Sequence, residues 1–398
     1  METPSSNRIH IGFFGRMNAG KSSLINAFTG QPVSIVNETA GTTTDVVRKP
    51  MEIHGIGACT LLDTAGFDDA GELGRQRTAA AEKAAAAADL AVVLFGNDDY
   101  EAEKQWIRQF RERRTPVIGV FSQMDVRSRE KTFEAAAKLE EELHIPVCTV
   151  SSKTGEGLEE LRRTMVEVMQ GTKRRSVTAG LVKEGDVAVL VMPQDKQAPE
   201  GRLILPEVQT IRDLLDKDCI AVCTSVEKLP AVLAGLKKDP DIVITDSQAF
   251  KEVYPLVPES VKLTSFSILF AGLKGDIRYY AESAKAIARL NENSRVLIAE
   301  CCTHAPMEED IGRVKIPRLL RKKAGQNLQV DIKAGVDFPE DASDYDLIIQ
   351  CGGCMFNRKY VMSRIESAKQ ANVPMTNYGI AIAYLNGILD HVTLPEEG

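Results

Sequence analysis

Short apolar runs alternate with longer amphipathic stretches along the first part of the chain. A short uninterrupted apolar run is typical of a strand buried on both faces, whereas apolar positions three or four apart indicate a helix. The predicted strands cover residues 8–14, 58–62, 116–121 and 147–150, and the predicted helices cover residues 23–29 and 77–88. Strands that alternate with helices in this way predict an α/β domain with a mainly parallel sheet.

The same alternation returns twice after a polar segment at residues 171–175, which is typical of a linker. The next part is predicted to have strands at residues 186–192, 219–224, 241–245 and 262–266, and helices at residues 207–216 and 229–236. The last part is predicted to have strands at residues 295–299, 328–333 and 347–350, helices at residues 276–290, 311–323 and 360–371, and further apolar segments at residues 374–378 and 380–385. We therefore predict an α/β protein with domains at residues 1–175, 176–270 and 271–398, the last two smaller and also mainly parallel.

The first predicted strand runs directly into a glycine-rich loop. Residues 15–22 read G-R-M-N-A-G-K-S, which is the P-loop pattern in its strand–loop–helix context. In such a loop, backbone amides and the helix N-terminus surround the phosphates, Lys21 reaches the β- and γ-phosphates, and Ser22 binds Mg²⁺. The candidate nucleotide-binding residues here are Gly15, Asn18, Ala19, Gly20, Lys21, Ser22 and Ser23. The first domain is thus predicted to bind a nucleoside triphosphate.

A carboxylate and a threonine can complete the magnesium site. Asp63 follows the second predicted strand in the sequence D-T-A-G, where it can hold Mg²⁺ through water and where the Gly66 amide can meet the γ-phosphate. Thr43 lies between these motifs, in G-T-T-T-D at residues 41–45, and is the candidate that binds Mg²⁺ and senses the γ-phosphate. This segment is predicted to be a switch that triphosphate orders and hydrolysis releases.

Two later strand ends can read the base. Guanine requires a carboxylate that accepts hydrogen bonds from its N1–H and 2-amino groups, and Asp125, which follows the third predicted strand, fits that role. Ser151, Ser152 and Lys153 follow the last strand of the domain, where a backbone amide can meet the guanine carbonyl. The expected nucleotides are therefore GTP and GDP.

Together these motifs resemble the Era/TrmE-like branch of the small GTPases, and the resemblance covers the whole first domain. Members usually carry Asn/Thr-Lys-x-Asp where this chain reads S-Q-M-D at residues 122–125. Gln123 stands where a lysine stem would cover the guanine face. The resemblance implies that Asp125 keeps the guanine specificity and leaves the effect of Gln123 on affinity open.

The same resemblance bears on hydrolysis. Phe67 follows D-T-A-G, where Ras-like enzymes have a glutamine that positions the attacking water, and an apolar side chain cannot do this. Asn18 lies where TrmE-like members hold a potassium ion, so K⁺ is implied to supply the charge of an arginine finger; otherwise Asn18 is a loop-stabilising amide. We expect slow, K⁺-stimulated hydrolysis of GTP. The expected catalytic residues are Lys21, Asn18, Thr43 and Gly66.

The middle domain shows no phosphate loop and no cluster of catalytic residues. Cys219 and Cys223 lie four apart on a predicted strand and are expected to pack in the core, because no histidine or further cysteine lies near them in sequence. A domain without chemistry of its own commonly serves association. We therefore predict a homodimer formed through residues 176–270.

Two cysteine motifs follow predicted strands of the third domain. Cys351 and Cys354 form C-G-G-C, and Cys302 and His304 form C-T-H. Ligands in open α/β sheets bind beyond the carboxyl ends of strands, so these residues can meet at one point. Three thiolates can hold an iron–sulfur cluster with one iron open or weakly held by His304, and with His304 they can equally form a closed zinc site. Cys301 is expected to pack, because on a continued strand it faces away from Cys302.

Composition limits the class of protein. The chain has 398 residues, of which 43% are hydrophobic, and its net charge of −7 gives no general basic surface for nucleic acid. It has no apolar run long enough to span a membrane, and its first residues lack the pattern of a signal peptide. We expect a cytoplasmic protein without nucleic-acid or membrane partners, whose eight cysteines are mostly reduced.

Behind a TrmE-like domain, Cys302-x-His304 with a distant Cys351-x-x-Cys354 resembles the HydF family of [FeFe]-hydrogenase maturation GTPases, and the match spans the chain in domain order. The resemblance implies a [4Fe-4S] cluster on the three cysteines. It also implies a scaffold and carrier that assembles the two-iron subcluster with radical-SAM maturation proteins and delivers it to apo-[FeFe]-hydrogenase. Many members have a histidine where this chain has Gln350, so His304 remains the candidate fourth or exchangeable ligand.

Two other functions stay open. An RNA-associated GTPase, as other TrmE/Era-like proteins are, predicts a basic and aromatic surface that the acidic balance does not favour. A zinc-stapled regulatory GTPase uses the same cysteines, and metal content separates it from the iron–sulfur protein.

Overall fold

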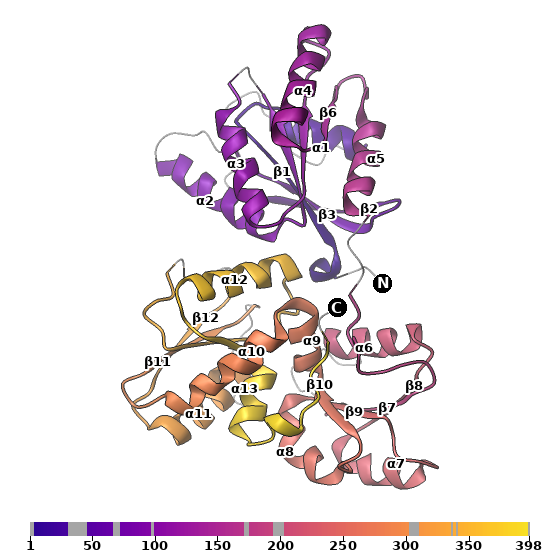
Figure 1. Cartoon of the computed structure of the whole chain (residues 1–398), viewed down its shortest axis with the longest axis vertical. Helices are drawn as coiled ribbons and strands as arrows, with labels where there is room; N and C mark the ends of the chain where they lie inside the picture. Colours follow the sequence, from indigo (N-terminus) through magenta and orange to yellow (C-terminus); the bar gives the residue numbers. More distant parts are fainter. Residues whose placement is uncertain are drawn as a thin grey trace. The chain divides into compact units, whose positions relative to one another are not determined.

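The computed structural model describes residues 4–30, 46–66, 72–96, 99–170, 175–193, 203–301, 310–335, 337–339 and 341–396. The chain divides into two compact units, Met1–Lys173 and Arg174–Gly398. Figure 1 shows the helices and strands of each unit. Both units are built from strands with helices packed against them, so the predicted α/β fold is confirmed.

The first unit contains a six-stranded sheet in the order β2-β3-β1-β4-β5-β6. Its elements are β1 (Ile9–Gly15), α1 (Lys21–Thr29), β2 (Val47–Ile53), β3 (Gly57–Asp63), α2 (Glu72–Ala87), β4 (Leu90–Phe95), α3 (Glu101–Glu112), β5 (Val117–Phe121), α4 (Arg129–Leu143), β6 (Val147–Thr149) and α5 (Leu158–Met169). The strand pairs are parallel except β2 with β3. Because parallel strands end at one edge, the loops after β1, β3, β5 and β6 all leave the sheet on the same side.

Helices cover both faces of this sheet (Figure 1). Alternate residues of β4 point to opposite faces, so Val92 packs in a core with α1 and α5, whereas Val93 packs in a core with α2, α3 and α4. A strand buried on both faces has no polar alternation, which explains the continuous apolar runs. The edge strand β2 alternates between more and less exposed residues.

The second unit contains two four-stranded parallel sheets, in the orders β10-β9-β7-β8 and β12-β11-β13-β14. The elements of the first sheet region are β7 (Val187–Val191), α6 (Leu205–Asp216), β8 (Ile220–Thr224), α7 (Leu229–Gly235), β9 (Ile242–Thr245), α8 (Phe250–Val253), β10 (Lys262–Ser265) and α9 (Phe266–Lys274). Those of the second are α10 (Ile277–Ala284), β11 (Arg295–Ala299), α11 (Ile316–Ala324), β12 (Gln329–Lys333), β13 (Leu347–Gln350), α12 (Arg358–Gln370), β14 (Met375–Asn377) and α13 (Tyr378–Leu385).

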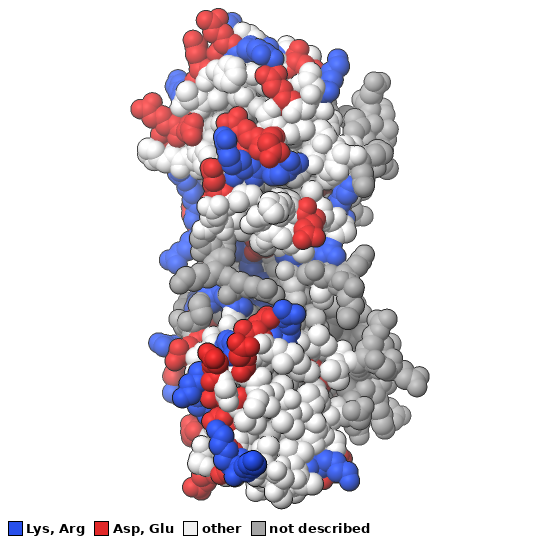
Figure 2. Space-filling view, turned by 90° about the vertical axis from the view of Figure 1, so that its right-hand side faces the viewer, with Lys and Arg blue, Asp and Glu red and all other residues white. Residues whose placement is uncertain are grey.

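Large apolar side chains are exposed on α6 and on the edge strand β8. The exposed fractions are 46% for Val208, 55% for Leu215 and 56% for Ile220. Figure 2 views the side on which α6, α7 and β8 lie and shows a broad uncharged area on the second unit. Cys219 is buried, but Cys223 is exposed, so the prediction that both pack in the core is wrong for Cys223. The strand begins at Ile220, after Cys219, and lies at the edge of its sheet.

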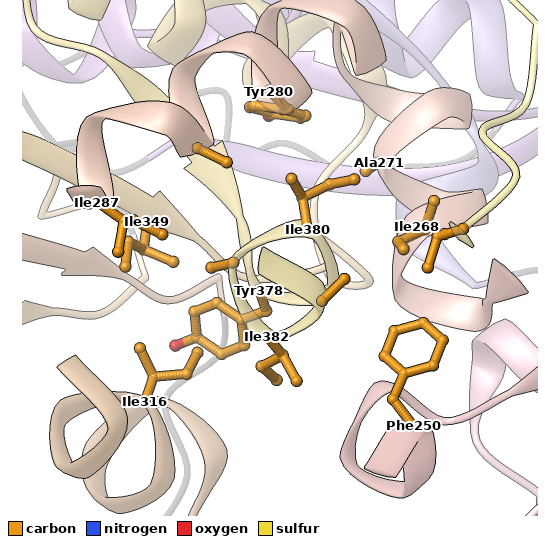
Figure 3. Close-up of a cluster of buried hydrophobic side chains, with 14 of the residues drawn as sticks. Phe250, Ile268, Ala271, Tyr280, Ile287, Ile316, Ile349, Tyr378, Ile380 and Ile382 are labelled. Carbon is orange, nitrogen blue, oxygen red and sulfur yellow. The ribbon is translucent and has the colours of Figure 1, made fainter. Parts of the chain in front are cut away.

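One hydrophobic core joins the two sheets of the second unit. It contains Val243 from β9, Ile268 from α9, Ile349 from β13 and Ile380 from α13, and Figure 3 shows several of its side chains. Helix α13 is apolar on all sides and packs against α9. The expected boundary at residue 270 lies within α9, in the middle of this shared core.

Some elements differ from the predicted ones. The strand predicted at residues 262–266 ends at Ser265, because Phe266 begins α9 and the Ser265 side chain accepts a hydrogen bond from the Ile268 amide as its N-cap. The helix predicted at residues 276–290 is α10 followed by a 3₁₀ turn at Lys285–Arg289. Among the described residues, no helix combines the length and apolar character needed to cross a membrane.

Candidate functional site

The glycine-rich loop after β1 holds the ammonium group of Lys21 in its centre. Lys21 is the first residue of α1, and its buried Nζ donates to the carbonyl oxygens of Gly15 at 2.8 Å and Arg16 at 2.7 Å. Gly20 has a φ of 90° and Asn18 a φ of 59°, a left-handed conformation that glycine and asparagine tolerate best. The loop therefore presents a fixed positive charge at a helix N-terminus, where phosphate binds.

The magnesium candidates Ser22 and Asp63 lie together. The Ser22 hydroxyl donates to Oδ2 of Asp63 at 2.7 Å, and Asp63 is buried at the end of β3. Next to it, the Thr64 hydroxyl donates to the Phe13 carbonyl at 2.6 Å and ties the strand end to β1. Gly66 follows at the same edge, whereas Thr43 and Phe67 lie outside the described residues. The geometry fits a carboxylate and a hydroxyl around one divalent cation.

A cavity of about 430 Å³ lies beside the loop, at the ends of β5 and β6. Its lining residues are Gly20, Ser23, Asn26, Ala27, Gln123, Asp125, Ser152 and Lys153. Asp125 is exposed and accepts a hydrogen bond from the Ser151 hydroxyl at 2.9 Å, which fixes its carboxylate. The structure thus brings the predicted base-reading residues to one cavity that adjoins the phosphate loop.

Gln123 links this cavity to the phosphate loop. It has a φ of 63°, and its side-chain amide donates to the Asn18 carbonyl at 3.3 Å. The preceding Ser122 hydroxyl donates to the Ala19 carbonyl at 2.5 Å. Ser122 and Gln123, which precede Asp125, therefore donate hydrogen bonds to two consecutive carbonyl groups of the phosphate loop.

Arg16 is a loop residue whose partners sequence reasoning missed. Its guanidinium makes ion pairs with Asp99 at 3.0 Å and with the buried Glu103 of α3 at 3.3 Å. The hydrogen bond from Arg16 lowers the pKa of Asp99. The sequence around Glu103 contains no recognisable motif, so no pattern in the sequence indicated its ion pair with Arg16.

The cysteines lie at the carboxyl ends of two neighbouring strands. Strands β11 and β13 are parallel, with Ala299 opposite Gln350, so the residues after them leave the sheet side by side. Cys351 and Cys354 are both partly exposed. The Cys301 backbone amide donates to the Cys351 sulfur at 3.1 Å. Hydrogen bonding with the Cys301 thiol, together with burial, raises the pKa of the Cys351 thiol.

Lys274, the last residue of α9, reaches the loop that carries Cys354. Its buried ammonium donates to the carbonyl oxygens of Gly353 at 2.8 Å and Phe356 at 2.7 Å, and it lies 3.5 Å from the Cys354 carbonyl. Burial lowers its pKa to about 8, and the nearby cysteine sulfurs oppose this shift. Gly353 has a φ of 69°, so this turn requires a residue that tolerates the left-handed region.

Gln350 occupies the place where a histidine was expected from the family pattern. Its buried side-chain amide donates to the Cys301 sulfur at 2.9 Å and accepts from the Arg364 guanidinium at 3.1 Å. Cys301 is buried, in agreement with its expected packing position. Strand β11 ends at Ala299, however, so the alternation used to place Cys301 does not continue through it.

A thiolate-bound metal centre fits the part of this site that the structure describes. The described part supplies two of the three expected cysteines, Cys351 and Cys354. The Cys301 backbone amide points at the Cys351 sulfur, and the buried ammonium of Lys274 lies at the loop that carries both cysteines. Cys302 and His304 lie outside the described residues. Without them, no group of three or more His, Cys, Asp or Glu residues that could hold a metal is found in the described ranges.

Three family models match the chain. The model described as 50S ribosome-binding GTPase matches residues 10–123. The hydrogen maturase F dimerization domain matches residues 177–275, and the hydrogen maturase F tetramerization domain matches residues 278–395, so these two models together cover more than half of the chain. The chain belongs to the hydrogen maturase F family. The resemblance to HydF is therefore confirmed, and the first unit is a P-loop GTPase domain.

Curated relatives match less than half of the chain. The tRNA modification GTPase MnmE of Chromobacterium violaceum is 33% identical over 166 residues, which are 40% of this chain and 35% of that protein. GTPase Der of Wolinella succinogenes is 34% identical over 197 residues, 46% of this chain and 40% of that protein. The chain thus spans well under half the length of these curated relatives.

Solved structures show a similar, partial match. The G domain of the FeoB iron transporter of T. maritima has 26% sequence identity and a TM-score of 0.33, and covers 41% of this chain and 100% of its own. Era of Aquifex aeolicus has 17% identity and a TM-score of 0.37, and covers 56% of this chain and 97% of its own.

Proposed function

We propose that the protein is a GTP-hydrolysing scaffold and carrier for metallocluster assembly. It binds a [4Fe-4S] cluster on Cys302, Cys351 and Cys354, assembles the two-iron subcluster with radical-SAM maturation proteins, and delivers it to apo-[FeFe]-hydrogenase. His304 is the proposed exchangeable ligand. The observation that carries the proposal is the pair of partly exposed cysteines, Cys351 and Cys354, that follows β13 beside the end of β11, in a chain whose second unit matches hydrogen maturase F.

The GTPase part rests on the contacts around the phosphate loop. Lys21 would bind the β- and γ-phosphates, Ser22 and Thr43 would bind Mg²⁺, and Asp125 would read guanine. Asn18 would hold K⁺, whose positive charge would stabilise the negative charge that develops in the transition state. Two observations support this assignment. The Ser22 hydroxyl lies within hydrogen-bond distance of the Asp63 carboxylate, where both can bind one Mg²⁺, and Asp125 lines the cavity beside the phosphate loop.

The three proposed domains divide these tasks. Residues 1–175 hydrolyse GTP, residues 176–270 dimerise the protein, and residues 271–398 bind the cluster. The support for self-association is the match to the dimerization and tetramerization models together with the exposed apolar residues of α6 and β8. An edge strand with apolar exposed residues is a surface on which a second chain can pair.

Self-association is tested with Ile220→Lys. A lysine on this edge strand opposes pairing with another chain, so we expect the molar mass measured by light scattering to fall to that of a smaller assembly. Lys238→Ala, at an exposed lysine of the same sheet region, is the matched control and keeps the wild-type mass. An unchanged mass for Ile220→Lys would place the interface elsewhere.

Cluster binding is tested by metal analysis of protein purified without oxygen. Iron, sulfide and zinc are measured, with EPR after reduction, in the wild type and in Cys302→Ala, Cys351→Ala and Cys354→Ala. About four irons and four sulfides per chain in the wild type, lost in each variant, support the cluster. Cys223→Ala, at an exposed cysteine on β8, is the matched control. One zinc without sulfide would instead indicate a regulatory GTPase with a structural zinc site.

Delivery is tested with protein produced together with the radical-SAM maturation proteins. After purification it is mixed with apo-[FeFe]-hydrogenase, and hydrogen evolution is measured. We expect activation by the wild type and by Cys223→Ala, and none by Cys351→Ala. Equal activation by Cys351→Ala would contradict the carrier function, even if that variant had lost its iron.

A further inference from the structure

Lys274 contacts the cysteine loop from a distant part of the chain. It ends α9, 79 residues before Gly353, and its Nζ lies over the Phe270 ring, 5.6 Å from the ring centre. An ammonium has three donors, and the carbonyls of Gly353, Cys354 and Phe356 surround it. A lysine in this place fixes the backbone on both sides of Cys354.

No carboxylate among the described residues is paired with Lys274. In the described part of the second unit, neither Lys274 nor Arg364 forms an ion pair with an acid. Glu300, the buried acid before Cys301, is paired with Arg313 at 2.9 Å. Cys301, Cys351 and Cys354 are instead near enough to Lys274 to oppose the lowering of its pKa by burial. A buried cation without a negatively charged partner is costly, so this edge of the sheet suits an anionic ligand.

Arg364 adds a second buried cation on the same side. Its guanidinium lies 5.0 Å from the Phe338 ring, 4.9 Å from Phe356 and 5.1 Å from Tyr360, and 4.0 Å from the Cys301 sulfur. These rings leave the guanidinium little freedom to move. Two buried positive charges therefore lie beside cysteine residues, Lys274 at the loop of Cys354 and Arg364 at Cys301.

We propose that Lys274 is a positioning residue for the metal centre, which holds the Cys351–Cys354 loop by its carbonyls and supplies a fixed positive charge to a thiolate-bound, negatively charged cluster. The proposal rests on the proposed function and identifies a residue of that site outside both cysteine motifs. A cluster bound by three thiolates is anionic, and reduction adds a further negative charge. A nearby buried cation stabilises the reduced form more than the oxidised form.

The test compares Lys274→Met, which keeps the stem and removes charge and donors, with Lys274→Arg, which keeps the charge but changes the donor geometry. Lys262→Met is the matched control, because Lys262 donates to the Leu181 carbonyl at 2.8 Å in the other sheet. Circular dichroism establishes that each variant folds. Iron and sulfide are measured after anaerobic reconstitution, and the ratio of reduced to oxidised cluster is measured by EPR at the wild-type midpoint potential.

We expect Lys274→Met to bind less cluster and to lower the reduced-to-oxidised ratio about tenfold or more. Lys274→Arg should bind less cluster but keep the ratio within about threefold, because the charge remains. Lys262→Met should match the wild type in both. Wild-type values for Lys274→Met would overturn the proposal. A lower cluster content with an unchanged ratio would also overturn it, since only a structural role would remain.

A second measurement separates this proposal from the proposed function. If the wild type itself binds no iron and sulfide, the cluster function fails. The metal-free proteins are then titrated with Co²⁺, and the thiolate-to-cobalt charge-transfer absorption is followed. Binding weakened about tenfold in Lys274→Met and clearly less in Lys274→Arg supports the role of the charge at a thiolate metal site. Equal Co²⁺ affinities in the wild type and Lys274→Met would overturn it.

Discussion

The phosphate loop and the cysteine loop each follow a parallel strand, and each surrounds a buried lysine ammonium with main-chain carbonyl oxygens. Lys21 is held by Gly15 at 2.8 Å and Arg16 at 2.7 Å, and Lys274 is held by Gly353 at 2.8 Å and Phe356 at 2.7 Å. In both loops a glycine with positive φ allows the turn. Two separate sheets thus arrive at a similar arrangement of carbonyl oxygens around a lysine ammonium.

The two lysines differ in where they come from. Lys21 belongs to its own loop, five and six residues from its acceptors, and begins α1, so the helix N-terminus adds to its charge. Lys274 ends α9 and lies 79 and 82 residues from its acceptors. The phosphate loop is therefore complete within a short sequence, whereas the cysteine loop depends on the fold to supply its cation.

The largest effect is expected for Lys21→Ala. Without the ammonium, the phosphates lose their central charge, so GTP hydrolysis should fall about a hundredfold or more. Iron and sulfide content should stay at the wild-type level if the loops are independent. Phosphate release and metal content are measured together, with Lys138→Ala, at an exposed lysine of α4, as the control. Loss of iron in Lys21→Ala would show that the two sites are coupled.

Asp125→Asn should have the next largest effect. An asparagine offers the guanine N1–H and 2-amino groups a donor in place of one acceptor, so GTP affinity should fall about tenfold to a hundredfold. Xanthosine triphosphate, which presents a carbonyl there, should bind better than it does to the wild type. Competition with a fluorescent nucleotide measures both, and Glu130→Gln, on the exposed side of α4, is the control. Unchanged base preference would mean that another group reads the base.

Exchange of K⁺ for Na⁺ tests the proposed role of Asn18. At equal ionic strength, GTP hydrolysis should be about fivefold or more faster in K⁺, because the proposed site at Asn18 would hold K⁺ better than the smaller Na⁺ and so bring its charge to the phosphates. Asn18→Ala should remove this difference. Equal rates of the wild type in both salts would leave Asn18 as a loop residue, whose carbonyl accepts from Gln123.

The smallest effect is expected for Gln123→Lys. A lysine stem would cover the base plane at the cavity, and its ammonium could still donate to the Asn18 carbonyl. GDP affinity, measured by calorimetry, should rise about threefold. Gln170→Lys, at an exposed glutamine after α5, controls for the added charge. An affinity that falls would show that Gln123 already makes a better contact with the base.

The features that were predicted best from the sequence are those formed by residues close together in the chain, namely the nucleotide-binding motifs and the fold class. Gly15 to Ser22, Asp63 and Asp125 each follow an apolar strand, and the alternation of helices and strands indicated the α/β class. β4 went unpredicted, because the alanine-rich helix before it merges with its apolar run. The edge strand β2 also went unpredicted, since its alternation includes Pro50 and charged residues.

Contacts between distant residues could not be predicted. Nothing in the sequence near Lys274 or Arg364 relates them to the cysteines, because only the packing of α9 and α12 on the sheet brings them there. Gln350 was regarded as a departure from the family pattern, and its hydrogen bonds to Cys301 and Arg364 give it a place in the buried network. Thr43, Cys302 and His304 stay predictions.

The core that joins the two sheets of the second unit has a consequence for how the chain can be divided. Helix α9 places Ile268 in that shared core and Leu269 in the separate core of the first sheet, so it belongs to both. If the chain were divided near residue 275, each of the two sheets would lose the other as a packing partner. The apolar sides of α9 and α13 would then be exposed. We therefore expect the sheet of β7–β10 and the sheet of β11–β14 to unfold as one cooperative body that cannot be exchanged between proteins as two separate modules.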